Sequence, residues 1–360
     1  MVYKQNRISY NKNARIEGEQ LFDAGISCKK KQLQVYMEAA YMEQISIQEI
    51  ENIKIGNAQN SLAGTGCTVI LCEQGAPAGL AVFGGGPASR ETQLLKSTAA
   101  ADVIHAVLLS GGSAFGLDAA GGVQKYLEER KIGVDVGVTT VPLVCQSCLF
   151  DLTVGDVHVR PDRDMGYAAC LASEKFEYQD GNYGAGTGAT VGKLYGMDYC
   201  MKSGIGSYAV QIGDLKVAAV VAVNALGDIF DWKTGEKKAG LLAEDRRAFR
   251  STQEEVFKSY EVVKNKFVGN TTIGVVITNA KFQKPELNKL AQMAHNGYAR
   301  SIYPVNTSAD GDSIYALSVG TVKADQDVVG TLAAQVVSEA ILKAVESAET
   351  AYGYPSVRDL

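Results

Sequence analysis

Apolar runs of strand length recur along the chain from about residue 50 onward. Each run holds about four to eight mainly apolar or β-branched residues between glycine, proline or polar residues, which is typical of a buried strand. The predicted strands cover residues 67–72, 79–83, 103–109, 216–223, 271–278 and 313–319.

Three other segments place apolar residues at helical spacing. One helix is predicted to open at Gly111-Gly112-Ser113 and to bury a face that begins with Phe115. A second starts near Pro285, a residue suited to the first turn of a helix, and a third runs from about Asp325 to Ser347. Groups of strands interleaved with helices predict layered sheets covered by helices.

Two stretches break this pattern. Residues 1–41 are polar and lack periodicity, and we interpret them as an extension outside a single domain of residues 42–360. Residues 231–268 hold 16 charged residues among 38, about twice the density of the whole chain, and predict a solvated arm or surface helix.

Composition narrows the classes of function. The net charge of −5 gives no support for nucleic-acid binding, which usually needs a basic face. No apolar run reaches the ~18–20 residues of a membrane span, and the N-terminus shows no signal-peptide pattern. Seven scattered cysteines fit buried thiols in a reducing cytoplasm. We therefore expect a cytoplasmic protein without nucleic-acid or membrane partners.

Several short motifs do not by themselves indicate a functional site. The three histidines lie far apart, with His105 inside an apolar strand, where it is interpreted as a satisfied core residue. The pair Cys145 and Cys148 has no second pair to complete a zinc site, and its flanks do not fit a thioredoxin-type motif. The segment Gly112–Gly116 misses the Gly-x-Ser-x-Gly elbow of serine hydrolases by one residue.

Two further segments are ambiguous in isolation. The glycine-rich stretch 184–193 lacks the preceding strand of a dinucleotide site and the spacing of a phosphate loop, so it is either a turn that delivers Lys193 or a turn before a surface lysine. Asp310-Gly311-Asp312 is either a plain acidic turn or a pair of carboxylates that converge on one cation. No metal or organic cofactor is expected.

The segment Gly269-Asn270-Thr271-Thr272 joins the charged stretch to a predicted strand. A threonine at such a junction can attack the preceding carbonyl group and cut the chain, which frees an α-amine with a pKa of ~7.7–8.0 beside its own hydroxyl nucleophile. An ordinary Gly-Asn turn that enters a strand is the alternative.

Taken together, these segments resemble the DmpA-type peptidases, which include L-aminopeptidase/D-esterases, β-peptidyl aminopeptidases and 6-aminohexanoate-oligomer hydrolases. The resemblance extends from about residue 47 to 347. It is carried by residues 65–70, 109–117 and 184–193, Asn224, Gly269-Asn270-Thr271-Thr272 and Asp310-Gly311-Asp312.

The resemblance implies an α/β fold, an αββα sandwich of the DmpA/ornithine-acetyltransferase type. It also implies self-cleavage between Asn270 and Thr271 into an α chain of residues 1–270 and a β chain of residues 271–360. Thr271 would then be the nucleophile and Asn224 the donor to the oxyanion.

The family pattern also gives Lys193 the task of tuning or orienting the nucleophile. It gives Asp310 and Asp312 that of holding the new ammonium group or positioning the nucleophile. Some members carry a tyrosine where this chain has Phe150, which leaves Phe150 out of the predicted catalytic set.

The function expected from this resemblance is an autoprocessed N-terminal-nucleophile aminopeptidase or amidohydrolase acting on small peptides or amino-acid amides. The alternatives are an endo-acting hydrolase of 6-aminohexanoate-type oligoamides, an acyltransferase of the glutamate N-acetyltransferase kind, and a silent binding protein that keeps the fold. The resemblance further implies a homo-oligomer, a tetramer or larger, of αβ protomers.

Overall fold

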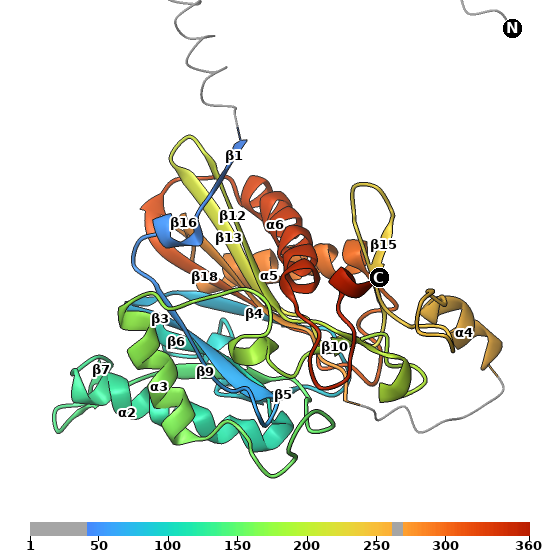
Figure 1. The fold of residues 1–360 in the computed structure, drawn as a ribbon. Coiled ribbons are helices and arrows are strands. Elements are labelled where there is room, and N and C mark those ends of the chain that lie inside the picture. Colours follow the sequence, from blue (N-terminus) through green and yellow to red (C-terminus); the bar gives the residue numbers. More distant parts are fainter. Residues whose placement is uncertain (1–41, 261–268) are drawn as a thin grey trace, which may run out of the picture.

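The computed structural model describes residues 42–260 and 269–360. The extension predicted for residues 1–41 and the last part of the charged stretch lie outside this range. Two large sheets lie face to face, and helices cover both outer faces (Figure 1). The expectation of an αββα sandwich is confirmed.

The first sheet has six strands in the order β1-β12-β13-β16-β18-β4. Its bounds are β1 Met42–Ile45, β12 Ile205–Ile212, β13 Leu215–Ala222, β16 Ile273–Ala280, β18 Ser313–Val322 and β4 Ala78–Val82. At its centre β13 runs antiparallel to β16, and β16 runs parallel to β18. The end of β13 and the starts of β16 and β18 therefore meet at one edge.

The second sheet has five strands in the order β2-β3-β6-β9-β5. Its bounds are β2 Lys54–Asn60, β3 Thr65–Ala76, β6 Ile104–Ser110, β9 Val144–Cys148 and β5 Ala88–Arg90. The inner faces of the two sheets share one buried cluster, to which Ile70 and Val107 contribute from this sheet and Val275 and Ile277 from the other. Strands of this kind are buried on both faces, which explains their nearly continuous apolar sequence.

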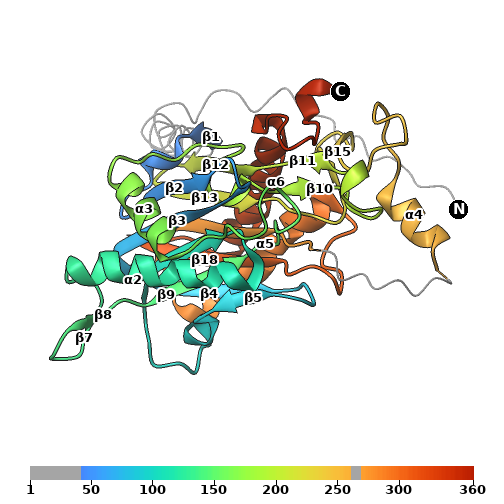
Figure 2. The ribbon, with the colours of Figure 1, turned by 60° about the horizontal axis from the view of Figure 1, so that its bottom comes forward.

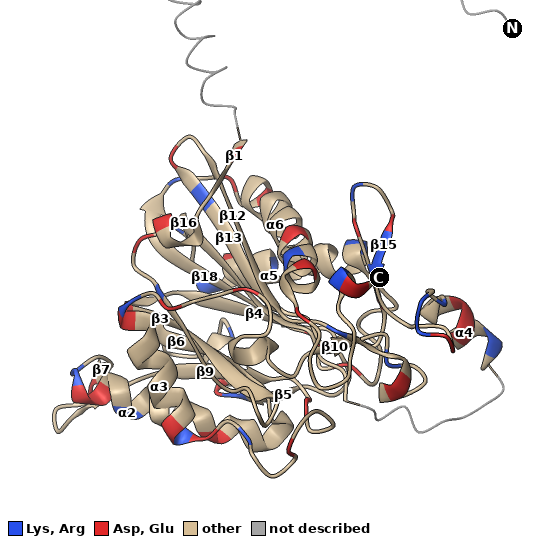
Figure 3. Ribbon diagram, viewed as in Figure 1, with Lys and Arg blue, Asp and Glu red and all other residues tan. Residues whose placement is uncertain are grey.

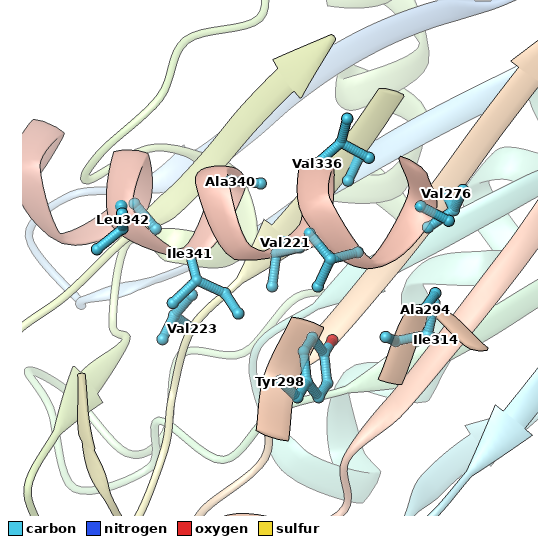
Figure 4. Packing of buried hydrophobic residues seen from close by; sticks show 14 of the residues in the cluster. Val221, Val223, Val276, Ala294, Tyr298, Ile314, Val336, Ala340, Ile341 and Leu342 are labelled. Carbon is cyan, nitrogen blue, oxygen red and sulfur yellow. The ribbon is translucent and has the colours of Figure 1, made fainter. Parts of the chain in front are cut away.

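Helices α5 (Lys284–Ser301) and α6 (Gln326–Ser347) cover the six-stranded sheet. Figure 4 shows Val336, Ala340 and Ile341 of α6 near Tyr298 of α5 and Val221 of β13, all within one buried cluster. Removing such side chains from water contributes roughly 25 cal/mol per Å² of apolar surface.

Capping residues explain where these two helices begin. The side chain of Asp325 accepts hydrogen bonds from the backbone N–H groups of Asp327 and Val328 at the start of α6. Pro285 lies in the first turn of α5, as predicted. By length and hydropathy α6 could cross a membrane, but 72 % of its most apolar stretch is buried, as in the core helix of a globular domain.

Helices α2 (Ala120–Glu129) and α3 (Arg163–Glu174) cover the five-stranded sheet on the opposite side of the molecule (Figure 2). The helix predicted to open at Ser113 begins instead as a 3-10 segment, Ser113–Ala119, and becomes α-helical only at Ala120. Phe115 was wrongly placed on its buried face: the ring is 58 % exposed, and the Arg160 guanidinium stacks on it.

The charged stretch predicted for residues 231–268 is only partly a solvated arm. Helix α4 (Thr252–Lys258) carries charges of both signs at the periphery (Figure 3). Leu241 and Leu242 are buried, however, and Lys237 forms an ion pair at 2.6 Å with Asp228, which is buried just ahead of the stretch. The first half of the segment therefore packs onto the domain.

The remaining motifs behave as core residues. His105 is buried in β6, and its Nδ1 accepts a hydrogen bond from the Leu143 backbone N–H, which confirms the structural interpretation. Cys145 and Cys148 are free thiols buried in β9, and burial raises the pKa of Cys145 to about 12. A thiol with so high a pKa is a weak nucleophile at neutral pH.

Candidate active site

Three neighbouring strands bring the predicted residues together at one edge of the six-stranded sheet. Asn224 follows β13, Thr271 precedes β16, and Asp312 directly precedes β18. The strand pairing continues past the last ladder residues, because the Thr271 backbone N–H donates to the Asn224 carbonyl oxygen at 2.9 Å. A parallel bridge joins Asn270 to Asp310 on the other side.

The peptide bond between Asn270 and Thr271 lies at the centre of this cluster, and both residues are buried. The Thr271 hydroxyl donates a hydrogen bond to the Asn270 carbonyl oxygen. That oxygen also accepts the Gly311 backbone N–H at 3.2 Å. The Thr271 hydroxyl, the Asn270 carbonyl group and the Gly311 N–H are therefore in mutual contact, as an attack of this hydroxyl on this carbonyl group would require.

Gly311 must be a glycine for this arrangement. A Cβ atom at this position would lie 2.8 Å from the Thr271 hydroxyl oxygen, which is closer than van der Waals contact allows. The Gly311 N–H also points at that hydroxyl oxygen, at 3.2 Å. This role of Gly311 was not predictable from the acidic turn in the sequence, because it depends on the register of the strands.

Lys193 reaches the cluster from the loop after β10 (Thr190–Val191), a short strand paired with β11 (Met201–Lys202) at one end of the two large sheets (Figure 2). Its buried Nζ donates to Asn224 Oδ1 at 2.7 Å, to the Asn224 carbonyl oxygen at 3.2 Å and to the Gly269 carbonyl oxygen at 2.8 Å. Burial lowers the pKa of Lys193 to about 7.

The Asn224 side chain is fixed on both of its polar atoms. Its Oδ1 accepts from Lys193 Nζ and from the Thr190 backbone N–H, the latter at 3.1 Å. Its Nδ2 donates to the Phe150 carbonyl oxygen at 2.9 Å and to the Gly269 carbonyl oxygen at 3.3 Å. This amide thus binds the carbonyl oxygen of the residue before Asn270, and its predicted role toward the oxyanion stays a prediction.

The two aspartates hold backbone amides around Thr271. Asp312 accepts the Thr272 N–H at 2.7 Å and the Asn306 N–H at 2.9 Å, and Asp310 accepts the Thr307 N–H at 2.7 Å. Burial, and next the neighbouring Asp310 carboxylate, raise the pKa of Asp312 to about 7. Burial raises the pKa of Asp310 as well. In the uncleaved chain these contacts are those of positioning residues.

Sequence reasoning missed Asp151, next to Phe150. Its buried carboxylate accepts the Thr65 hydroxyl and the Gly112 backbone N–H, each at 2.7 Å. Burial raises its pKa to about 6. Asp151 thereby ties the Gly111-Gly112 turn to the segment whose carbonyl oxygen orients Asn224. The only signal for Asp151 in the sequence is its position between the segments 109–117 and 184–193.

Lys202 was missed for a similar reason. It is fully buried in β11, and its Nζ donates to the carbonyl oxygens of Gly186 and Ala189 at 3.1 Å each. Burial lowers its pKa to about 7. This side chain shapes the glycine-rich loop that leads to Lys193.

A small pocket of about 40 Å³ opens beside the Asn270–Thr271 bond. Besides residues 269–271, its walls are formed by small or apolar residues: Gly86, Ala88, Ser113, Cys148, Phe150 and Ala309. The chain segment 269–271 itself forms part of the wall of this pocket.

Gly269 fits closely under the Phe150 ring. Its φ is +36°, and a Cβ atom would lie 2.0 Å from the ring. The residue before Asn270 is therefore restricted to glycine by its conformation and by this contact.

The sequence model of peptidase family S58 matches residues 46–358. The chain belongs to peptidase family S58. An uncharacterized aminopeptidase of Mycobacterium leprae is 37 % identical over 339 residues, covering 86 % of this chain and 92 % of that protein. A 6-aminohexanoate-oligomer endohydrolase of Kocuria sp. is 28 % identical over 314 residues, covering 83 % and 85 %.

Solved structures share this fold. The L-aminopeptidase D-Ala-esterase/amidase of Ochrobactrum anthropi, described as a variant of the N-terminal-nucleophile hydrolase fold, superposes with a TM-score of 0.64. The two chains are 18 % identical, and the match covers 84 % of this chain and 86 % of that one. Family and fold together make this S58 protein a hydrolase of the aminopeptidase type.

Proposed function

We propose that this S58 hydrolase cuts itself between Asn270 and Thr271 and then uses Thr271 as its nucleophile on amide bonds. The substrates would be small peptides or amino-acid amides. The observation that carries the proposal is the contact between the Thr271 hydroxyl and the Asn270 carbonyl group at the start of a buried strand.

Self-cleavage follows from this contact in two steps. The Thr271 hydroxyl oxygen attacks the Asn270 carbonyl carbon while the Gly311 N–H stabilises the oxyanion. The hydroxyl proton passes to the Thr271 nitrogen as the C–N bond breaks, which gives an ester and a free Thr271 amine. Water then hydrolyses the ester, which leaves chains of residues 1–270 and 271–360.

The processed enzyme would repeat the same chemistry on a substrate. The Thr271 amine, with an ordinary pKa of ~7.7–8.0, takes the proton of the hydroxyl as the oxygen attacks the substrate carbonyl group. The proton passes to the leaving amine, and water releases the acyl group from Thr271. Asn224 and Lys193, freed from the Gly269 carbonyl oxygen, are then available as donors to the substrate.

Two adjacent threonines provide a matched test. Thr271→Ala should abolish both self-cleavage and amide hydrolysis because the nucleophile is gone. Thr272→Val should keep both, since the buried Thr272 hydroxyl has no hydrogen-bond partner among the described residues. Chain cleavage is read by denaturing electrophoresis and hydrolysis by release of p-nitroaniline from aminoacyl anilides. Amide hydrolysis retained by Thr271→Ala would refute the proposal.

The setting of the enzyme is part of the proposal. The six cysteines in the described part of the chain are free and buried, which suits a reducing cytoplasm. It includes a homo-oligomer of αβ protomers, a tetramer or larger, and the exposed valines on the hairpin of β7 (Val134–Asp135) and β8 (Thr140–Val141) are the candidate for its interface.

A further inference from the structure

We propose that a glycine-rich strap, residues 83–87, forms a substrate-facing wall of the active site, and that Gly86 in this strap limits the size of the substrate side chain beside the bond that is cut. The strap joins β4 of the six-stranded sheet to β5 of the five-stranded sheet. The inference rests on the proposed function, because it adds a specificity-determining residue to the same site.

The strap is bound to the acidic turn that carries Gly311. The Phe83 backbone N–H donates to the Asp312 carbonyl oxygen at 3.0 Å, and the Gly86 N–H donates to the Asp310 carbonyl oxygen at 2.8 Å. These bonds hold the strap directly against the backbone that presents the Gly311 N–H to the proposed site of cleavage. The strap is therefore part of the active site and not a remote loop.

The first two glycines of the strap are required by packing. A Cβ atom on Gly84 would lie 2.4 Å from the Asp310 carbonyl oxygen and 2.4 Å from the Asp312 nitrogen. A Cβ atom on Gly85 would lie 2.7 Å from the Ser308 carbonyl oxygen. Both distances are shorter than the 3.0 Å that real Cβ atoms keep, and the opposing atoms belong to the backbone. The fold itself thus explains these two glycines.

Gly86 is different, because the fold does not require a glycine there. A Cβ atom at this position would meet only the Asp310 carbonyl oxygen, at 3.8 Å, which is an ordinary van der Waals contact. Its φ lies outside the left-handed region that favours glycine. Gly86 is exposed and lines the pocket beside the Asn270–Thr271 bond. A side chain at position 86 would therefore occupy space at the wall of this pocket without displacing the backbone.

The pocket lies on the acyl side of Thr271, since Asn270 forms part of its wall. A substrate residue that replaces Asn270 before the cut bond would place its side chain at the same wall. The residues of the described chain that line the pocket carry no charged side chain, and Ala88, Phe150 and Ala309 are apolar. Burying an unpaired charge against such groups is costly, so the wall favours an uncharged side chain.

The strap does not limit the amine of the substrate. The carboxylates of Asp310, Asp151 and Asp312 all act on the Lys193 ammonium group, so the site holds negative charge beside its one lysine. The α-amine of an aminopeptidase substrate has carboxylates nearby to balance it. The inference thus concerns only the side chain of the residue whose amide bond is cut.

The test compares two substrates on one enzyme, the p-nitroanilides of L-alanine and L-leucine. We expect Gly86→Val to lower the ratio of kcat/KM for the leucine compound to kcat/KM for the alanine compound by about tenfold or more, because the added methyl groups take the space of the larger side chain. A loss of folded enzyme lowers both values equally and leaves this ratio unchanged. A ratio equal to that of the wild type would overturn the inference.

Two further glycine variants serve as controls. Gly86→Ala adds a single methyl group and should shift the ratio in the same direction by a smaller factor. Gly84→Ala should lower both kcat/KM values by a similar factor, because it displaces the acidic turn and not the pocket wall. A shift of the ratio in Gly84→Ala as large as that in Gly86→Val would overturn the inference, since the ratio would then report general damage to the site.

Chain cleavage separates this inference from the proposed function. Each variant is followed by denaturing electrophoresis, and its folding is checked by circular dichroism. A folded Gly86→Ala chain that stays uncut would overturn the inference, because the space at Gly86 would then serve Asn270 and not a substrate. A wild-type chain that stays uncut, or a processed wild type that hydrolyses neither compound, would count against the proposed function itself and the inference with it.

Discussion

Lys193 presents three protons on a buried nitrogen to three oxygen acceptors on Asn224 and Gly269. This geometry suits the ammonium form, while burial acts against it and lowers the pKa to about 7. The side chain therefore combines a specific hydrogen-bonding role with a cost in stability.

The cost has a defined pH dependence. An unfolded lysine has a pKa of ~10.4, so between about pH 7 and pH 10 the unfolded chain binds more protons than the folded one, and folding gains stability as pH rises. In a Thr271→Ala background, which keeps one chain, the stability of the Lys193→Met variant relative to the parent should fall by about 2 kcal/mol from pH 7 to pH 9. Urea unfolding measures it, and a pH-independent difference would show an unshifted lysine.

The carboxylate of Asp312 accepts hydrogen bonds from two backbone N–H groups of the site. In Asp312→Asn one oxygen is replaced by an NH₂ group that faces an N–H donor, which costs about 1–3 kcal/mol. Because Thr272 would lose its fixed position beside the nucleophile, we expect self-cleavage to slow by about tenfold to a hundredfold. The readout is the growth of the β chain after cell-free synthesis, and wild-type rates in the variant would argue against a positioning role.

At the scale of the element, the short segment before β16 positions the Asn270–Thr271 bond that we propose to be cut. Gly269 combines a positive φ with direct contact to the Phe150 ring. We expect Gly269→Ala to stop or strongly slow self-cleavage, because the added methyl group displaces either the ring or the Asn270 carbonyl group.

Gly235 provides the control for this substitution. Its φ is +74°, but a Cβ atom there meets nothing within 4 Å. Gly235→Ala should cost about 1 kcal/mol from backbone strain and leave processing unchanged. Electrophoresis measures the rate of chain cleavage in both variants. Equal rates would mean that the contact between Gly269 and Phe150 does not affect self-cleavage.

Elements were predictable from sequence where periodicity was strong and local. The runs that became β3, β6, β13 and β18 are mainly apolar, and α6 carries its own N-cap. The segment after Gly112 was misjudged because its apolar residues fit a helix, while Ser113 adopts a positive φ and the chain starts as a 3-10 turn. Tertiary contacts decide such cases.

On the scale of the whole molecule, the resemblance to a family supplied what local patterns could not. Asn224, Thr271 and Asp312 lie far apart in sequence, and only the strand order β13-β16-β18 brings them to one edge. The roles of the Gly311 amide and the Phe150 carbonyl oxygen were not predictable, because backbone groups have no signature in a sequence. Lys202 and Asp151 were missed for the same reason, because their side chains bind backbone groups of neighbouring loops.

The association of protomers also belongs to the scale of the whole molecule. Val138 at the tip of the β7–β8 hairpin is 93 % exposed, and three further valines of the hairpin are also exposed. If this surface joins protomers, Val138→Asp should lower the mass of the assembly measured by light scattering after gel filtration. Leu62→Asp, at an equally exposed residue outside the hairpin, should not. An unchanged assembly in Val138→Asp would exclude this hairpin as the interface.

The central claim is that the chain breaks before Thr271 by its own chemistry. The most direct test is the intact mass of the freshly purified wild-type protein under denaturing conditions, with Thr271→Ala alongside. We predict two chains that meet between Asn270 and Thr271 in the wild type and one uncut chain in the variant. A wild-type protein of full mass, or a variant cut at the same bond, would contradict the account.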